Sequence, residues 1–124
     1  MMRRSLWLVG VLAVSATAQT AAAVESPFAC NLKAINASER KQHEQRTYKL
    51  FTSIEEKNEL SDGYAFRLAN SVSLREAAQW VDLESKCCPF FDFQLERRRE
   101  GGALWLRLTG RPGVKEFIRE EFRQ

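Results

Sequence analysis

Apolar and polar residues alternate in three short segments of the chain, which is the pattern of β-strands with one buried face. The apolar members of these segments are Tyr64, Phe66 and Leu68, then Phe91, Phe93 and Leu95, then Leu104, Leu106 and Leu108. A fourth segment, Glu55 to Leu60, predicts either a strand or a continuation of the helix before it. We expect an antiparallel sheet with one apolar face covered by helices and one polar face in water.

Three other segments carry apolar residues at helical spacing. Asn36 with Glu39 is a capping-box pair, and it predicts a helix that begins there and runs to about residue 54. The expected buried stripe of this helix lies in its second half: Tyr48, Leu50, Phe51 and Ile54. A second helix is predicted from residue 74 to about residue 88, with these residues on one face: Leu74, Ala77, Ala78, Val81 and Ser85. A third is predicted from residue 114 to about residue 122, with Val114, Phe117, Ile118 and Phe122 on one face.

An internal repeat links these elements. Residues 64–76 resemble residues 104–116, which lie 40 positions later, and the identical pairs are Arg67/Arg107, Leu68/Leu108 and Glu76/Glu116. Each copy follows a glycine turn and a further candidate strand, so the repeated unit is strand, turn, strand, loop and helix. The sequence therefore predicts an α+β, two-layer fold. Its antiparallel sheet of about four strands comes from duplicated ββα units, with helices on one face and one long helix before it.

The N-terminal segment has the features of an export signal. Arg3 and Arg4 precede an apolar run of 11 residues, residues 6–16, and small residues follow in two A-x-A patterns ending at Ala18 and Ala23. The run is shorter than the roughly 20 residues that span a bilayer. We therefore predict a signal peptide at residues 1–23, an extended leader at 24–35 and a single α+β domain at 36–124. The protein is expected to be periplasmic or secreted, with no stable membrane span after signal removal.

The charge of the chain argues against nucleic-acid binding. Its 124 residues carry a formal net charge of +3, but without Arg3 and Arg4 there are 17 basic residues against 16 acidic ones. No basic excess is left to bind a phosphate backbone. On the polar face of the expected sheet, Arg67, Trp105 and Arg107 form a candidate ligand or partner surface. The sequence identifies no protein partner.

Three cysteines, Cys30, Cys87 and Cys88, lie after the predicted signal peptide and would meet an oxidising compartment. Pro89 disfavours helix at the residue before it, so the cysteine pair marks the end of the second helix. Adjacent helical side chains diverge by about 100 degrees, so we expect one thiol to face inwards and the other to lie near the surface.

Four interpretations of these cysteines remain open, and one of them is that they are buried free cysteines without a role. A structural disulfide could join Cys30 to Cys87 or to Cys88 and give a stapled interaction module without catalytic activity. Alternatively, Cys30, Cys87 and Cys88 could bind a thiophilic ion such as copper, zinc, mercury or arsenite, with the single histidine, His43, as a weak further candidate. Thiol-disulfide exchange at Cys87 and Cys88, with Cys30 resolving, is less favoured because the chain has no Cys-x-x-Cys motif and a disulfide between adjacent cysteines is strained.

Other chemistry finds little support in the sequence. Gly101 and Gly102 indicate a hairpin turn, and the chain has neither a glycine-rich phosphate loop nor a serine in a nucleophile-elbow context. The carboxylates nearest to the cysteine pair in sequence are Glu84 and Asp92. We therefore favour a non-enzymatic protein whose distinguishing feature is its thiols, and soft-metal binding is the favoured role.

The run ESKCCPFFDFQLERRREGGALWLRLTGRPGVKEFI, together with ACNLKAI upstream, resembles a family of small uncharacterised bacterial proteins. The shared signature is Cys-Cys-Pro-Phe at a strand entry, then a leucine-rich strand and Leu-Thr-Gly-x-x-Gly before a final helix. The resemblance covers most of the chain after the signal segment. It implies no established activity; it suggests a link to heavy-metal handling, and this chain would be an exported member.

Overall fold

A computed structural model describes residues 10–17 and 25–122 of the chain. The predicted α+β class is confirmed: the described residues form one four-stranded antiparallel sheet, three α-helices and a short 3-10 helix, η1. In chain order the elements are η1 (Leu32–Ala34), α1 (Ala37–Thr52), β1 (Glu56–Glu59), β2 (Gly63–Leu68), α2 (Leu74–Cys87), β3 (Asp92–Arg97), β4 (Leu104–Thr109) and α3 (Val114–Glu121).

The sheet has the strand order β1-β2-β4-β3, so the second strands of the two repeated units pair at its centre. Phe66 of β2 lies directly opposite Leu106 of β4, and these two residues hold equivalent positions in the repeat. The two ββα units are therefore arranged about the middle of this strand pair. The ambiguous segment after the first helix is strand β1, which pairs with β2 along its full length.

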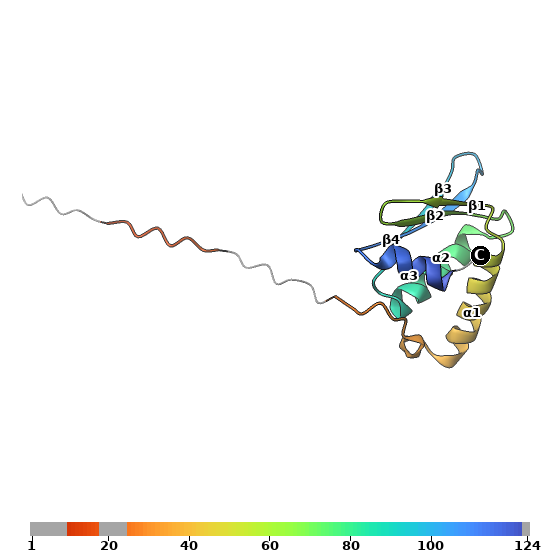
Figure 1. Ribbon diagram of the computed structural model, residues 1–124, viewed down its shortest axis with the longest axis horizontal. Coiled ribbons are helices and arrows are strands. Elements are labelled where there is room, and N and C mark those ends of the chain that lie inside the picture. Colours follow the sequence, from red (N-terminus) through yellow and green to blue (C-terminus); the bar gives the residue numbers. More distant parts are fainter. Residues whose placement is uncertain (1–9, 18–24, 123–124) are drawn as a thin grey trace, which may run out of the picture.

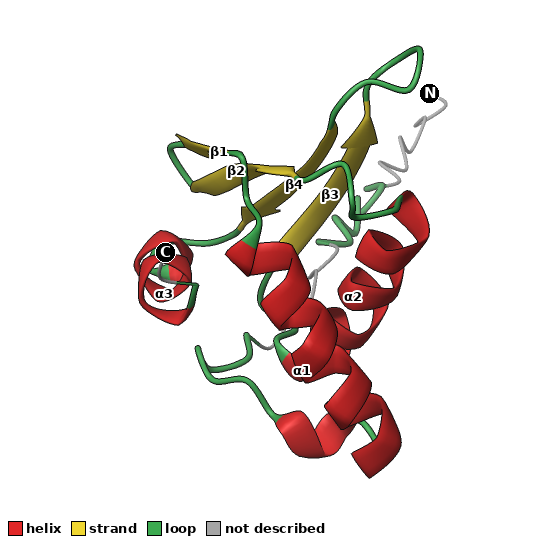
Figure 2. Cartoon of the chain, turned by 90° about the vertical axis from the view of Figure 1, so that its right-hand side faces the viewer, coloured by secondary structure: helices red, strands yellow, loops and turns green. Residues whose placement is uncertain are grey.

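The three helices lie on one side of the sheet (Figures 1 and 2). The side chains that β2 and β4 direct to this side are buried, as the alternation predicts: Tyr64, Phe66, Leu68, Leu104, Leu106 and Leu108. Helix α3 contacts β2 and β4, helix α2 contacts β3, and helix α1 packs mainly against α2. The core thus lies between the sheet and α2 with α3, while α1 forms an outer support.

Helix α2 buries a different face from the one expected. Its buried side chains are Ala77, Trp80, Leu83, Glu84 and Cys87, whereas Leu74 is 45% exposed and Ala78 and Ser85 are exposed. The expected face is confirmed at Ala77, which is buried, and at Val81, which packs against the core. It was wrong at the other three positions because the indole of Trp80, fully buried against Phe51, Phe93 and Phe122, determines which side of the helix packs inwards. For α3 the prediction is confirmed, since Val114, Ile118 and Phe122 are buried and Phe117 is partly buried.

Helix α1 begins at the predicted place and is capped as predicted. The Asn36 side chain accepts the Glu39 amide at 2.8 Å, and the Glu39 carboxylate accepts the Asn36 amide at 3.4 Å. Leu50 is buried and Phe51 is partly buried, but Tyr48 is 73% exposed, so its expected place in the buried stripe was wrong. The helix packs on α2 along its middle instead, and the residue buried there is His43.

The segment before α1 is attached to the domain. Residues 32–34 form η1 rather than the extended backbone expected for the leader, and Ile35 belongs to the core. The Asn31 amide donates to the Cys87 carbonyl at 2.8 Å, and Arg40 of α1 donates to the carbonyls of Leu32 and Ile35. The leader is therefore held between the start of α1 and the end of α2.

Most of the predicted signal peptide, residues 1–9 and 18–23, lies outside the described residues. Residues 10–17 have no regular secondary structure and are exposed. None of the described helices is long and apolar enough to cross a membrane.

Candidate functional site

A disulfide joins Cys30 in the leader to Cys88 at the end of α2, across 58 positions of sequence. This decides between the two pairings left open by the sequence. Cys88 is the C-cap residue of α2; its backbone has left helical geometry, and its amide donates to the Glu84 carbonyl at 2.7 Å. Helix termination before Pro89 therefore turns the second cysteine of the pair towards the leader.

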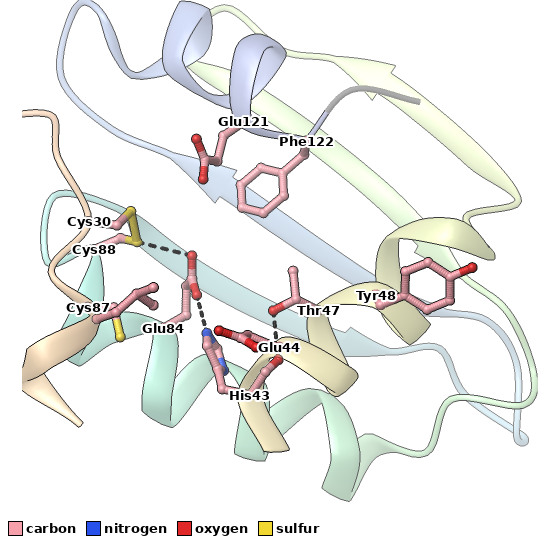
Figure 3. A pocket seen from close by; sticks show the side chains of 11 residues that line it. Cys30, His43, Glu44, Thr47, Tyr48, Glu84, Cys87, Cys88, Glu121 and Phe122 are labelled. Atoms are coloured by element: carbon pink, nitrogen blue, oxygen red, sulfur yellow. Dashed lines mark hydrogen bonds and ion pairs between the residues drawn. A yellow bond between two sulfur atoms is a disulfide. The ribbon is translucent and has the colours of Figure 1, made fainter. Parts of the chain in front are cut away.

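Cys87 is a free thiol on the last residue of α2. The expectation that one member of the pair lies near the surface was wrong, because Cys87 and Cys88 are each only 1% exposed. The docked leader supplies this cover, and Figure 3 shows that the Cys87 sulfur points away from the disulfide. Burial raises the pKa of the Cys87 thiol above its ordinary value; the nearby Glu84 adds to the rise and Arg40 opposes it.

A buried acid and a buried histidine lie beside the disulfide. Glu84 is 6% exposed and His43 is 3% exposed, and the Glu84 Oε2 atom is in contact with His43 Nε2. The other carboxylate oxygen, Oε1, lies 3.1 Å from Cys88 Sγ (Figure 3). His43 Nδ1 has no hydrogen-bond partner in the described part of the chain. The carboxylate thus bridges α1 and the disulfide.

Neighbouring contacts hold His43 in place. Its ring stacks on Trp80 with ring centroids 6.0 Å apart, and the Trp80 Nε1 donates to Thr47 Oγ1 at 2.8 Å. The Thr47 hydroxyl in turn donates to the His43 carbonyl at 2.9 Å, one helical turn earlier. These contacts join α1 to α2 through polar groups, and they fix the imidazole that contacts Glu84.

The disulfide and the His43–Glu84 pair line a pocket of about 380 Å³ (Figure 3). Volumes of this size are typical of small-molecule sites. Its lining residues come from the leader, α1, α2 and the end of α3: Cys30, Leu32, His43, Glu44, Thr47, Tyr48, Glu84, Cys87, Cys88, Glu121 and Phe122. Three of the described lining residues are glutamates and none is a lysine or an arginine, so acidic side chains outnumber basic ones in the lining.

Part of the predicted thiol cluster meets the geometric requirement of a metal site. The Sγ atoms of Cys30 and Cys88 and one carboxylate oxygen of Glu84 lie within 4.8 Å of one another. Cys87 and His43, the other two candidates, are not members of this group, although both line the same pocket. In the disulfide the two sulfurs are bonded to each other, and only two-electron reduction turns them into thiolate donors.

The predicted surface on the other side of the sheet is separate from this site. Trp105 of β4 pairs with Arg67 of β2, and Arg107 lies two residues further along β4, so the three share one region of the sheet. None of them lines the disulfide pocket. Arg67 is paired with Glu55 at 3.8 Å and with Glu56 at 3.4 Å, so its charge is balanced within the sheet.

Glu84 is the site residue that the sequence should have indicated. It lies four residues before Cys88, the spacing that places two side chains on the same side of a helix. The burial of His43 has no comparable local signal, because its neighbours in α1 are polar and its partner lies 41 positions away in the sequence.

Comparison of the chain with protein-family models, with curated proteins and with solved structures finds no match.

Proposed function

We propose that the reduced protein binds one thiophilic metal ion through Cys30, Cys88 and Glu84. The observation that carries this proposal is the convergence of two sulfurs and one carboxylate oxygen within 4.8 Å. These ligands come from the leader and from α2, two segments that the fold holds together, so a bound ion would also fasten the leader to the domain.

The donor set favours zinc among the four ions that the cysteines suggest. Zinc is commonly bound by thiolate, imidazole and carboxylate groups together, whereas copper(I) and mercury are selected mainly by soft sulfur. His43 contacts the Glu84 oxygen that faces away from the sulfurs, and such a partner orients a metal-binding carboxylate. The described pocket lining contains no lysine or arginine, so a bound metal cation would balance the charge of the thiolates and the carboxylate.

Metal binding requires that the disulfide is opened first. Two molecules of a small thiol supply the electrons: the Cys30–Cys88 bond breaks, the two reductant sulfurs form a new disulfide, and each cysteine gains one proton. Both thiol protons leave when the metal binds, so affinity should rise with pH through the range in which thiols titrate. The oxidised protein is then the metal-free form.

The disulfide supports a second candidate, a stapled interaction module. The bond closes a long loop and is reinforced by the hydrogen bond from Asn31 to Cys87, which suits a purely structural role. We propose a periplasmic or secreted location on the basis of the disulfide, because disulfides persist in oxidising compartments. In such a compartment the stapled module needs no further step, whereas metal binding needs a reductant that opens the bond.

A zinc titration tests the proposal. The protein is reduced with a phosphine, which leaves no competing thiol, and zinc is titrated against a chromophoric chelator. We expect one zinc ion per chain, and at least a hundredfold weaker binding for Cys30→Ser, for Cys88→Ser and for the double variant. Glu84→Gln should weaken binding about tenfold or more, since neighbours and ligands of metal sites contribute on this order.

Cys87→Ser is the matched control, because it removes a thiol from the same pocket but not from the ligand group. It should bind zinc as the parent does. The reduced parent lacks the disulfide as the serine variants do, so circular dichroism can compare their folding directly. Absence of zinc binding by the reduced parent, or unchanged binding in the double variant, would overturn the proposal and leave the stapled module.

A further inference from the structure

The pocket beside the disulfide has a charge and a shape that select the reductant. We propose that the Cys30–Cys88 disulfide is opened by small thiols that carry a positively charged amine, which enter the pocket and attack Cys30. The link from this reduction to metal binding rests on the proposed function, because the disulfide has to be reduced before the metal can bind. The reduction step itself rests only on the disulfide and the pocket.

Access decides which sulfur is attacked. Cys88 is 1% exposed and is enclosed at the end of α2, whereas Cys30 is half-buried and both residues line the pocket. Thiol-disulfide exchange requires an approaching thiolate to reach a sulfur from outside. The mixed disulfide therefore forms on Cys30, and Cys88 leaves with the electron pair of the broken bond.

The bonds and electrons of the exchange balance with two reductant molecules. The first thiolate forms a bond to Cys30 Sγ while the Cys30–Cys88 bond breaks, and the Cys88 thiolate takes up a proton from solvent. The second thiolate attacks the sulfur of the first reductant in the mixed disulfide. The reductant disulfide departs, Cys30 gains a proton, and the protein has received two electrons.

The lining of the pocket supplies the preference for a cation. Glu44 and Glu121 are exposed carboxylates from α1 and α3, Glu84 is buried between them and the disulfide, and the described lining contains no basic side chain to offset them. A cleft lined by one sign of charge concentrates ligands of the opposite sign and accelerates their association. An anionic thiol meets repulsion in the same place.

An unpartnered nitrogen points to the same class of ligand. His43 Nε2 contacts the Glu84 carboxylate, so Nδ1 is the ring nitrogen left for a ligand. Nδ1 is buried without a hydrogen-bond partner among the described residues, and His43 lines the pocket. A ligand that brings an N–H donor would satisfy it, and an ammonium group does so while also balancing the carboxylates.

Reduction kinetics with three matched thiols test this inference. Cysteamine carries an ammonium group, 2-mercaptoethanol is neutral and 3-mercaptopropionate is an anion. Rate constants for opening the Cys30–Cys88 bond are divided by those for a small exposed disulfide, which removes differences in thiol reactivity. At low ionic strength we expect the normalised rate for cysteamine to exceed that for 3-mercaptopropionate about tenfold or more, and the ratio to shrink as salt is added.

Substitutions locate the source of the preference. Glu44→Gln and Glu121→Gln should each lower the ratio, and the double variant should lower it further, leaving only the part that Glu84 contributes. Glu100→Gln is the control, because it removes an equal charge from the β3–β4 turn and does not line the pocket. Acid quenching followed by peptide mapping should find the mixed disulfide on Cys30.

An anionic thiol that reacts as fast as cysteamine after normalisation would overturn the inference. So would an unchanged ratio in the double variant, or a mixed disulfide on Cys88. A metal chelator is present throughout, so the kinetics do not depend on zinc binding. Conversely, zinc is titrated after phosphine reduction, so the test of the metal site does not depend on which thiols reduce the disulfide.

Discussion

Cys87 and Cys88 are neighbours in sequence, yet the end of α2 gives them different environments. Cys87 is the last helical residue and keeps its side chain within the packed interior, whereas Cys88 leaves helical geometry and reaches Cys30. The carboxylate of Glu84 lies one turn before them and contacts the Cys88 sulfur. One pair of residues therefore supplies both a disulfide-bonded sulfur and an enclosed free thiol.

The enclosed thiol should be unreactive in the folded protein. Burial limits access to Cys87 and also raises its pKa, so less thiolate is present at any pH near neutrality. We expect iodoacetamide at pH 8 to modify Cys87 at least a hundredfold more slowly than it modifies the same chain in denaturant, as measured by peptide mass spectrometry. Equal modification rates in the folded and the denatured chain would show that Cys87 at the end of α2 is accessible to solvent, which would contradict its assigned burial.

The individual residues of the site were only partly predictable. The sequence identified the three cysteines, and helix spacing could have added Glu84, because that relation is local. The choice between Cys87 and Cys88 as the partner of Cys30 depends on the exact residue at which α2 ends. Local sequence patterns do not predict a helix boundary to within one residue. The burial of His43 depends on a contact with α2 that is distant in sequence.

The α1–α2 pair is the element that builds the site. His43 and Glu84 meet across it in the interior, and nearer the surface the Lys49 ammonium lies 2.6 Å from the Glu76 carboxylate. Glu76 also completes the capping box of α2 with Ser73, with bonds of 3.0 and 3.1 Å. The same carboxylate therefore begins α2 and joins it to α1.

The stability that Glu76 contributes should depend on pH. Its hydrogen bond to Lys49, followed by that to the Ser73 backbone, lowers the pKa of Glu76 below the ordinary value. A carboxyl group with a lowered folded-state pKa stabilises the protein above about pH 4.3, and this contribution is lost as the pH falls through the folded-state pKa. Glu76→Gln should reduce the free energy of unfolding by about 0.5 kcal/mol at pH 7, because the pair is largely exposed.

Urea unfolding at pH 7 and pH 3 measures this effect. The difference between the parent and Glu76→Gln should shrink at the lower pH, as the parent carboxyl takes up its proton, while Glu100→Gln should show no such trend. A difference that stays constant between the two pH values would contradict the assigned role of the carboxylate.

The elements were more predictable than their packing. Strand alternation, helical spacing and the Asn36–Glu39 capping pair are local patterns, and together with the 40-residue repeat they predicted three of the four strands and all three α-helices. The segment that forms β1 was left open between strand and helix. The face of α2 was predicted wrongly because several faces of that helix carry apolar residues, and only the surrounding rings decide that Trp80 packs inwards. The position of Tyr48 was also predicted wrongly, because α1 packs mainly against α2 and this contact leaves Tyr48 exposed.

For the whole chain, the disulfide joins a leader of little regular structure to a duplicated ββα domain. The symmetry of the two units follows from the sequence repeat and appears in the central β2–β4 pair. The site lies outside this symmetry, because it combines the ends of α2 and α3 with the leader and α1. A repeat within the sequence could not predict it, since the leader and α1 occur only once.

Opening the disulfide should lower the stability of the whole domain. Loop-closure entropy for a bond across about 58 residues amounts to at most about 4 kcal/mol. Denaturant unfolding should therefore show a loss of up to that amount on reduction, and a similar loss for Cys30→Ser, while Cys87→Ser in the oxidised form should retain the disulfide contribution. Identical stability of the oxidised and reduced protein would show that the leader is held by its other contacts alone.

Zinc added in excess to the reduced protein should recover part of the lost stability, because an ion that binds only the folded state shifts the equilibrium towards it. The same addition to the reduced Cys30→Ser, Cys88→Ser double variant should have no effect. Recovery in that variant would assign the stabilisation to another group.

X-ray absorption at the zinc edge of the one-to-one complex with the reduced protein tests the metal site most directly. The proposed ligands predict two sulfur scatterers at about 2.3 Å and the remaining scatterers at about 2.0 to 2.2 Å from oxygen or nitrogen. We expect both sulfur scatterers to be lost in the Cys30→Ser, Cys88→Ser double variant and to be retained in Cys87→Ser. A shell of three sulfurs, or one with no sulfur, would contradict it.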